Sequence, residues 1–318
     1  MIPISIVIQA VAPIFILALG GLFIRRYNLL SSEADSSLLK LTINVFSPCL
    51  AFDSIVGNRA LHIPSNLLIA PVIGYSTVAI GVLLALMSAR VFKFSDEKVK
   101  GTFALTVGLY NYGYVPLPLA LYLFSRETAG VLFVHNIGVE VALWTIGVLL
   151  LTDKSGKKID ISKIINVPLV SILLSVALNF LNAEQWIPKY VYIAITMLGH
   201  CAIPMGVILI GATIYDYLDE FNPQKGTKII LSSFLLRLLI LPMIFLAIAY
   251  VIPCSRELKS VIVLQAAMPS AVFPIVMTKH YGGDIKTALR VVISTSIVGL
   301  FTIPFWIQTG VKLLGLKN

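Results

Sequence analysis

Long apolar stretches, separated by short polar turns, account for most of this chain. A transmembrane helix needs about 20 mainly apolar residues. Charged residues make up 12% of the 318 residues. That is about half of their share in an ordinary soluble domain, so they cannot cover a water-facing surface. We therefore predict an all-α integral membrane protein with ten transmembrane helices, at residues 4–24, 36–57, 67–91, 101–124, 129–151, 163–182, 188–214, 228–252, 258–279 and 287–311.

Lysine and arginine are concentrated in the turns that follow the odd-numbered stretches. Arg25 and Arg26 follow the first stretch, and "FSDEKVK" follows the third. Positive residues are enriched in the cytoplasmic loops of membrane proteins. The pattern predicts a multi-pass protein of the cell (inner) membrane with both termini outside, and it accounts for much of the net charge of +9. We expect no nucleic-acid partner, because such binding gathers basic residues on one face.

Motifs of catalysis and metal binding do not occur in the sequence. There is no G-x-x-x-x-G-K-[ST] phosphate loop and no H-E-x-x-H zinc motif. The three cysteines, Cys49, Cys201 and Cys254, have no paired spacing, which argues against a disulfide framework or a zinc site. We therefore expect no enzymatic activity, no cofactor and no metal site.

The second half of the chain repeats features of the first. Pro48 and Pro204 lie in the second and seventh stretches. Pro118 and Pro274, separated by the same number of residues, lie in the fourth and ninth. Since five is an odd number, a second copy of five helices enters the membrane from the opposite side. We therefore predict a 5+5 inverted repeat, an arrangement found in many secondary transporters.

The fourth stretch contains "NYGYVPLPLA" at 111–120, with a glycine and two prolines, and the ninth contains Pro269 and Pro274. Proline removes a helix hydrogen bond and clashes with the carbonyl one turn back. We predict that both helices are broken near the bilayer centre and cross there. The unpaired N–H groups and positive dipole ends of their second halves would then meet and attract a carboxylate or another anion. The alternative is that the prolines only kink two continuous helices.

We predict that residues at and beside the two breaks bind the substrate. They are Asn111, Tyr112, Gly113, Pro116, Pro118, Gln265, Pro269, Ser270 and Pro274.

The two motifs resemble those of the auxin efflux carrier family. Bacterial permeases of that family tend to read G-N-T-G-F-x-G-L-P in span 4, and Asn111, Gly113 and Pro118 fall on the family's Asn, Gly and Pro. "AAMPSAVFPIVMTKHYGGD" is similar to the family's span-9 motif. The chain departs from the pattern at Pro116, where the family has Gly, and at Phe273, where many bacterial members have Asn.

The resemblance implies the fold of the bile-acid/sodium symporter-like superfamily. Its first five-helix unit would cover residues 1–155 and its second 156–318. Spans 1, 2, 6 and 7 would form a scaffold, and spans 3, 4, 5, 8, 9 and 10 a transport domain. It implies a secondary active transporter that moves a small mono- or dicarboxylate, such as malonate or an auxin-like acid, by alternating access. The alternatives are a cation/proton antiporter of the same fold and a ligand-binding membrane receptor that does not transport. A homodimer is the candidate assembly.

Ionisable residues at membrane depth mark functional sites. Glu140 and Asn136 lie one turn apart on one face of the fifth stretch, and Arg237 lies in the eighth. Two hypotheses stay open. Glu140 and Arg237 neutralise each other as a static pair, or Glu140 titrates and Arg237 serves as the counter-charge of an anionic substrate. A proton or a sodium ion is the candidate coupling ion.

Overall fold

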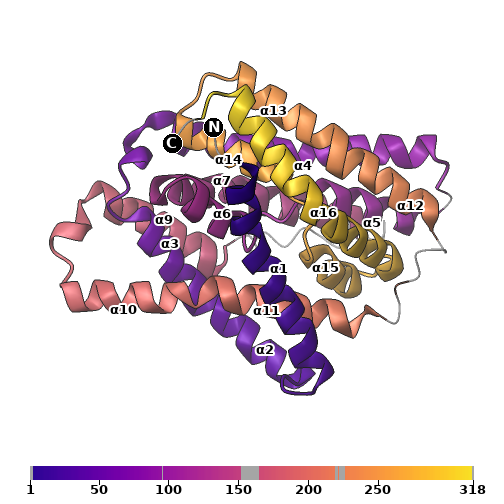
Figure 1. The fold of residues 1–318 in the computed structure, drawn as a ribbon, viewed down its shortest axis with the longest axis horizontal. Helices are drawn as coiled ribbons and strands as arrows, with labels where there is room; N and C mark the ends of the chain where they lie inside the picture. Colours follow the sequence, from indigo (N-terminus) through magenta and orange to yellow (C-terminus); the bar gives the residue numbers. More distant parts are fainter. Residues whose placement is uncertain (1–2, 95, 152–164, 219–220, 222–225, 317–318) are drawn as a thin grey trace.

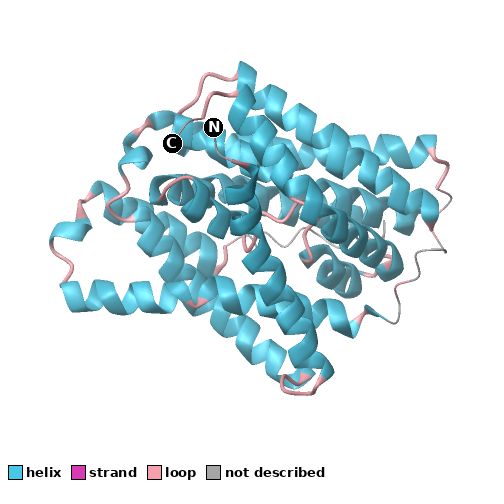
Figure 2. Ribbon diagram, viewed as in Figure 1, coloured by secondary structure: helices cyan, strands magenta, loops and turns pink. Residues whose placement is uncertain are grey.

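The computed structural model describes residues 3–94, 96–151, 165–218, 221 and 226–316, and its regular secondary structure is helical throughout these residues (Figure 2). The first half contains α1 (Ile4–Arg26), α2 (Ser32–Leu41), α3 (Ser47–Ile55), α4 (Pro64–Val91), α5 (Glu97–Gly108), α6 (Pro116–Leu123), α7 (Arg126–Ala142) and α8 (Val148–Leu151). The second half contains α9 (Val167–Phe180), α10 (Lys189–His200), α11 (Ala202–Asp216), α12 (Thr227–Ser233), α13 (Leu241–Val251), α14 (Arg256–Ala267), α15 (Phe273–Tyr281) and α16 (Ile285–Leu313). Short π-helical turns join α2 to α3, α7 to α8 and α12 to α13, namely η1 (Thr42–Phe46), η3 (Leu143–Gly147) and η7 (Phe234–Ile240).

Seven continuous helical segments of the described chain are long and apolar enough to cross a membrane. They are Ser5–Arg26, Glu33–Ile55, Pro64–Val91, Arg126–Leu151, Lys189–Asp216, Thr227–Val251 and Ile285–Leu313. Of the other predicted stretches, 101–124 and 258–279 are interrupted, and 163–182 begins outside the described residues. The structure is therefore that of a multi-pass membrane protein, while the count of ten spans and the inverted repeat remain predictions.

Polar side chains mark where several helices begin. The Ser125 hydroxyl accepts a hydrogen bond from the backbone N–H of Thr128 at 3.3 Å, and so begins α7. The Asp284 carboxylate does the same for Thr287 at 2.9 Å, at the start of α16. Such caps satisfy N–H groups that have no partner inside the helix, a requirement that becomes stricter where water is absent.

Helices that lie far apart in the sequence pack into two groups. In the first, α1 packs against α11, and α3 packs against α9 and α10. In Figure 1, α10 and α11 run as a horizontal band across the lower part of the molecule, with α2 below them. In the second, α4 packs against α5 and α7, and α14 against α13 and α16. Contacts of α1 with α16 and of α3 with α7 join the groups, so the division into scaffold and transport domain remains a prediction.

Glycines allow α4 and α7 to approach each other closely. A β-carbon at Gly74 would meet the backbone carbonyl of His135, and one at Gly138 would meet that of Pro71. Small residues at helix interfaces let backbones come together, which is typical of membrane proteins. This contact fixes the position of α7, which carries two of the predicted site residues.

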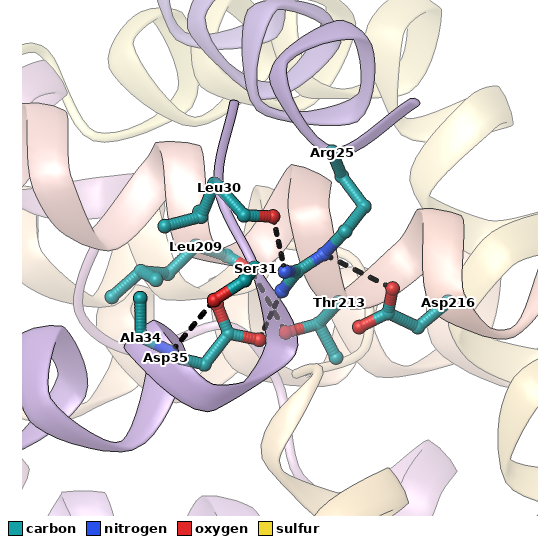
Figure 3. Close-up of polar contacts among 8 residues, drawn as sticks. All are labelled: Arg25, Leu30, Ser31, Ala34, Asp35, Leu209, Thr213 and Asp216. Atoms are coloured by element: carbon teal, nitrogen blue, oxygen red, sulfur yellow. Dashed lines mark hydrogen bonds and ion pairs between the residues drawn. The ribbon is translucent and has the colours of Figure 1, made fainter. Parts of the chain in front are cut away.

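Arg25, at the end of α1, ties three helices together (Figure 3). Its guanidinium forms ion pairs with Asp35 of α2 and with Asp216 of α11, the latter at 3.0 Å from Nε to Oδ1. Its Nη1 donates to the carbonyl of Leu30 at 2.6 Å. The Arg25 side chain is 6% exposed, against 27% for Asp35 and 35% for Asp216, so the charge is buried on one side only.

The two proline-containing helices are broken, and their breaks meet. α5 ends at Gly108 and α6 begins at Pro116, while α14 ends at Ala267 and α15 begins at Phe273. Between these ends the chains run antiparallel, with Tyr110 opposite Ser270. The prediction of two broken, crossing helices is confirmed, and the alternative of two kinked but continuous helices is wrong.

Two backbone hydrogen bonds hold this crossing. The N–H of Asn111 donates to the carbonyl of Pro269 at 2.8 Å, and the N–H of Ala271 donates to that of Leu109 at 2.9 Å. An unpaired backbone group in hydrocarbon costs several kcal/mol. Each broken helix therefore supplies partners that the other lost, which explains how the chain tolerates two interruptions side by side.

Candidate functional site

The backbone carbonyl of Tyr112 organises a polar cluster beside the crossing. The Asn136 side chain donates to it through Nδ2 at 2.7 Å, and the Gln265 side chain through Nε2 at 3.3 Å. Gln265 Nε2 also lies 3.2 Å from Asn136 Oδ1. One carbonyl thus joins the first break, α7 and α14, and three of the predicted site residues lie together.

Glu140 is held at this cluster by two donors. The Tyr112 hydroxyl donates to Oε1 at 2.6 Å, and the Trp144 indole N–H donates to Oε2 at 3.0 Å. The Trp144 ring contacts the Phe273 ring edge-on, with the ring centroids 6.2 Å apart. Glu140 is therefore linked to the first break through Tyr112 and to the start of α15 through Trp144, although it belongs to neither broken helix.

Arg237 does not pair with Glu140, so the predicted static pair is wrong. The three guanidinium nitrogens have no hydrogen-bond partner within the described residues. The guanidinium carbon instead lies 5.3 Å from the ring centroids of both Tyr110 and Phe245. The reason lies in the packing of distant segments. Tyr112 and Trp144 donate to the Glu140 carboxylate, while η7 places the Arg237 guanidinium against the rings of Tyr110 and Phe245.

The backbone N–H of Asn111 is hydrogen-bonded within the described residues, but its side chain is not. Its N–H belongs to the crossing, but its side-chain amide makes no hydrogen bond within the described part of the chain, and the residue is half-buried. An amide supplies two donors and an acceptor. Gly113, two residues later, has open space where a β-carbon would lie. Asn111 and Gly113 thus belong to the half-buried part of the predicted site, with Tyr112 and Pro118.

The first three residues of α6 carry no free N–H group. Pro116 and Pro118 have none, since proline carries no backbone N–H. Between them, the N–H of Leu117 donates to the carbonyl of Gly113 at 3.0 Å. Residues 116–118 therefore contribute no unpaired donor, while the dipole of α6 still points at the break.

The second break contains buried polar atoms without protein partners. Gln265 Oε1 and Ser270 Oγ are both buried and unbonded among the described residues. The N–H of Ser270 donates to Thr295 Oγ1 at 3.3 Å. Pro269 contributes its carbonyl to the crossing, and Pro274 lies in the first turn of α15. Buried polar atoms are usually hydrogen-bonded, so unbonded ones call for an explanation such as water or a ligand.

Sequence reasoning missed two residues of this site. Trp144 lies four residues after Glu140, and residues at that spacing are neighbours on a helix, so its contact could have been found. Phe245 packs edge-on against Tyr110, with ring centroids 5.7 Å apart. No signal in the sequence places it there, because α13 and the first break are distant in the chain.

A multi-pass helical membrane protein with two interrupted helices that meet in its interior has the architecture of a membrane transporter. The chain belongs to the auxin efflux carrier-type membrane transport family: the family model described as "Membrane transport protein" matches residues 6–168 and 157–307. The resemblance carried by the two motifs is confirmed.

Two archaeal relatives match the chain over nearly its whole length. An uncharacterized transporter of Methanocaldococcus jannaschii is 26% identical over 312 residues, which cover 96% of this chain and 98% of the relative. An uncharacterized transporter of Methanothermobacter thermautotrophicus is 27% identical over 305 residues, which cover 94% and 96%.

Proposed function

We propose that this protein is a secondary active transporter of a small organic anion, a mono- or dicarboxylate, and that it is a permease rather than an enzyme. The observation that carries the proposal is the crossing, where two broken helices and α7 gather polar side chains around the carbonyl of Tyr112, next to the half-buried Asn111 in the chain. Broken helices of this kind form the substrate sites of many secondary transporters.

In this proposal, the substrate binds to side chains rather than to helix N–H groups. The amide N–H of Asn111 and the hydroxyl of Ser270 donate to the carboxylate. Gln265 Oε1, which can only accept, takes a hydrogen bond from a donor group of the substrate or from water. Alternating access follows from movement of α4 to α8 and α12 to α16 against α1 to α3 and α9 to α11. The protein lies in the inner membrane with both termini outside, in keeping with its distribution of Lys and Arg.

Glu140 and Asn136 are the proposed coupling residues, with a proton or a sodium ion as the coupling ion. One observation also favours a second candidate function, a cation/proton antiporter of this fold. Such a protein needs a carboxylate at the crossing. Neither broken segment contains one, but α7 brings Glu140 into contact with Tyr112 of the first break.

Transport in reconstituted vesicles tests the proposal. We expect Asn111→Ala to weaken carboxylate uptake by about 10- to 100-fold, the value of a hydrogen bond to a charged group. Asn44→Ala is the matched control, since Asn44 is exposed and bonds only to the carbonyl of Lys40. Uptake that survives Asn111→Ala would remove this residue from the site. Cation exchange without any carboxylate flux would favour the antiporter.

A further inference from the structure

Arg237 is a fully buried arginine whose charge meets no anion in the described protein. Its exposure is 0%, and Nε, Nη1 and Nη2 all lack hydrogen-bond partners among the described residues. Burying an ionised group without a counter-charge is very costly. Residues kept in this state inside a membrane protein are functional by default.

Two aromatic rings hold the guanidinium in place. The Tyr110 and Phe245 rings each lie 5.3 Å from its central carbon, within the range of a cation–π attraction. The Tyr110 hydroxyl hydrogen-bonds with Thr77 Oγ1 at 2.8 Å, and it forms no hydrogen bond with Arg237. The rings therefore fix the position of the charge but leave its hydrogen-bonding capacity unused.

The charge lies beside the crossing, where positive potential is otherwise scarce. Tyr110, which contacts Arg237, is also the residue that bridges to Ser270. Residues 116–118 at the start of α6 offer no free N–H, because two of them are prolines and Leu117 is bonded to Gly113. Glu140, the carboxyl group at the same crossing, repels an anionic substrate whenever it is ionised. A site that binds carboxylates here needs a compensating positive charge, and Arg237 is placed to supply it.

We propose that Arg237 determines the charge selectivity of the site, its fixed positive charge stabilising the carboxylate of a substrate bound at the crossing. This inference rests on the proposed function, because it takes a carboxylate as the substrate. Arg237 acts through its field and through the Tyr110 ring, and so need not touch the ligand. For a separation on the order of 10 Å and an effective dielectric constant of about 20, a unit charge changes affinity by roughly 20-fold.

The test compares acids with their uncharged amides on the purified full-length protein. Malonate and indole-3-acetate are titrated against malonamide and indole-3-acetamide by calorimetry, using the wild type, Arg237→Gln, Arg237→Lys and Arg59→Gln. Arg59 is an exposed arginine distant from the crossing in the chain and is the matched control. We expect Arg237→Gln to weaken binding of the acids by about 20-fold while binding of the amides changes little. Arg237→Lys should retain most of the acid binding.

Three results would overturn the inference. Equal loss of acid and amide binding in Arg237→Gln would make Arg237 a packing residue, and unchanged acid binding would remove it from the site. Should the glutamine variant fail to fold, equal affinity of the wild type for the acid and its amide would still overturn the inference, because the site would then have no charge selectivity. In each case a loss of acid binding in Asn111→Ala leaves the proposed function standing. If no acid binds the wild type, both proposals fail.

Discussion

The hydrogen bond from Tyr112 to Glu140 can be removed with little change of shape by Tyr112→Phe. The bond measures 2.6 Å from the hydroxyl oxygen to Oε1, a length typical of a charge-assisted O–H···O⁻ bond. Only Trp144 then donates to the carboxylate. The carbonyl of Tyr112, which Asn136 and Gln265 contact, is unaffected by the change.

A hydrogen bond to a charged group contributes about 1.5–3 kcal/mol, so we expect a loss of about 2 kcal/mol in the free energy of unfolding. For a chain of 318 residues, that corresponds to a fall in Tm of about 3 °C, at an unfolding entropy of about 2.1 cal/mol/K per residue. Thermal unfolding of the purified protein in lipid nanodiscs measures it. Transport should fall as well, since the carboxylate loses the contact that links it to the first break.

Tyr122→Phe is the matched control for this experiment. Tyr122 lies in α6, is 60% exposed and should lose its hydroxyl without effect. If Tyr112→Phe and Tyr122→Phe melt at the same temperature and transport equally well, the Tyr112 hydroxyl does not hold Glu140, and the proposed link between this carboxyl and the crossing is refuted.

Three further substitutions test other contacts of the structure. Gly138→Ala places a β-carbon against a backbone carbonyl of α4 and should lower the free energy of unfolding by about 1–3 kcal/mol. Gly20→Ala, with open space around it, should not; equal melting of the two would contradict close packing of α4 and α7. Arg25→Gln removes two ion pairs that are partly exposed on their acidic side and should cost about 1–3 kcal/mol in thermal unfolding, whereas an unchanged melting temperature would show that α1 is held to α11 by packing alone. Glu140→Gln should make vesicle uptake insensitive to an imposed pH gradient if a proton is the coupling ion, and a retained response would assign Glu140 a structural role.

The broken helices could be predicted because their cause is local. Proline acts on the helix that contains it, and each interrupted stretch contains two closely spaced prolines, Pro116 with Pro118 and Pro269 with Pro274. Single prolines, such as Pro71 in α4, leave their helices continuous. The missing N–H groups at positions 116 and 118 follow from the same chemistry and could also be predicted from the sequence. Trp144 could have been recognised from its helical spacing to Glu140.

The partners of the buried charges could not be predicted in this way. Position along a stretch places Glu140 and Arg237 at similar depth, but depth does not determine which neighbouring helix each side chain faces. That choice depends on packing between segments far apart in the sequence, such as the contact of Tyr110 with Phe245. Charge complementarity alone suggested a pair, and the aromatic contacts of Arg237 replaced it.

The two peptide hydrogen bonds between Leu109–Asn111 and Pro269–Ala271 have an evolutionary consequence. They depend on main-chain atoms alone, so they persist when the side chains around them are exchanged. A lineage can therefore acquire a new ligand preference by single replacements at positions such as Asn111 or Ser270 without rebuilding the framework that supports them. Divergent specificity within one unchanged architecture is the expected outcome of such a design.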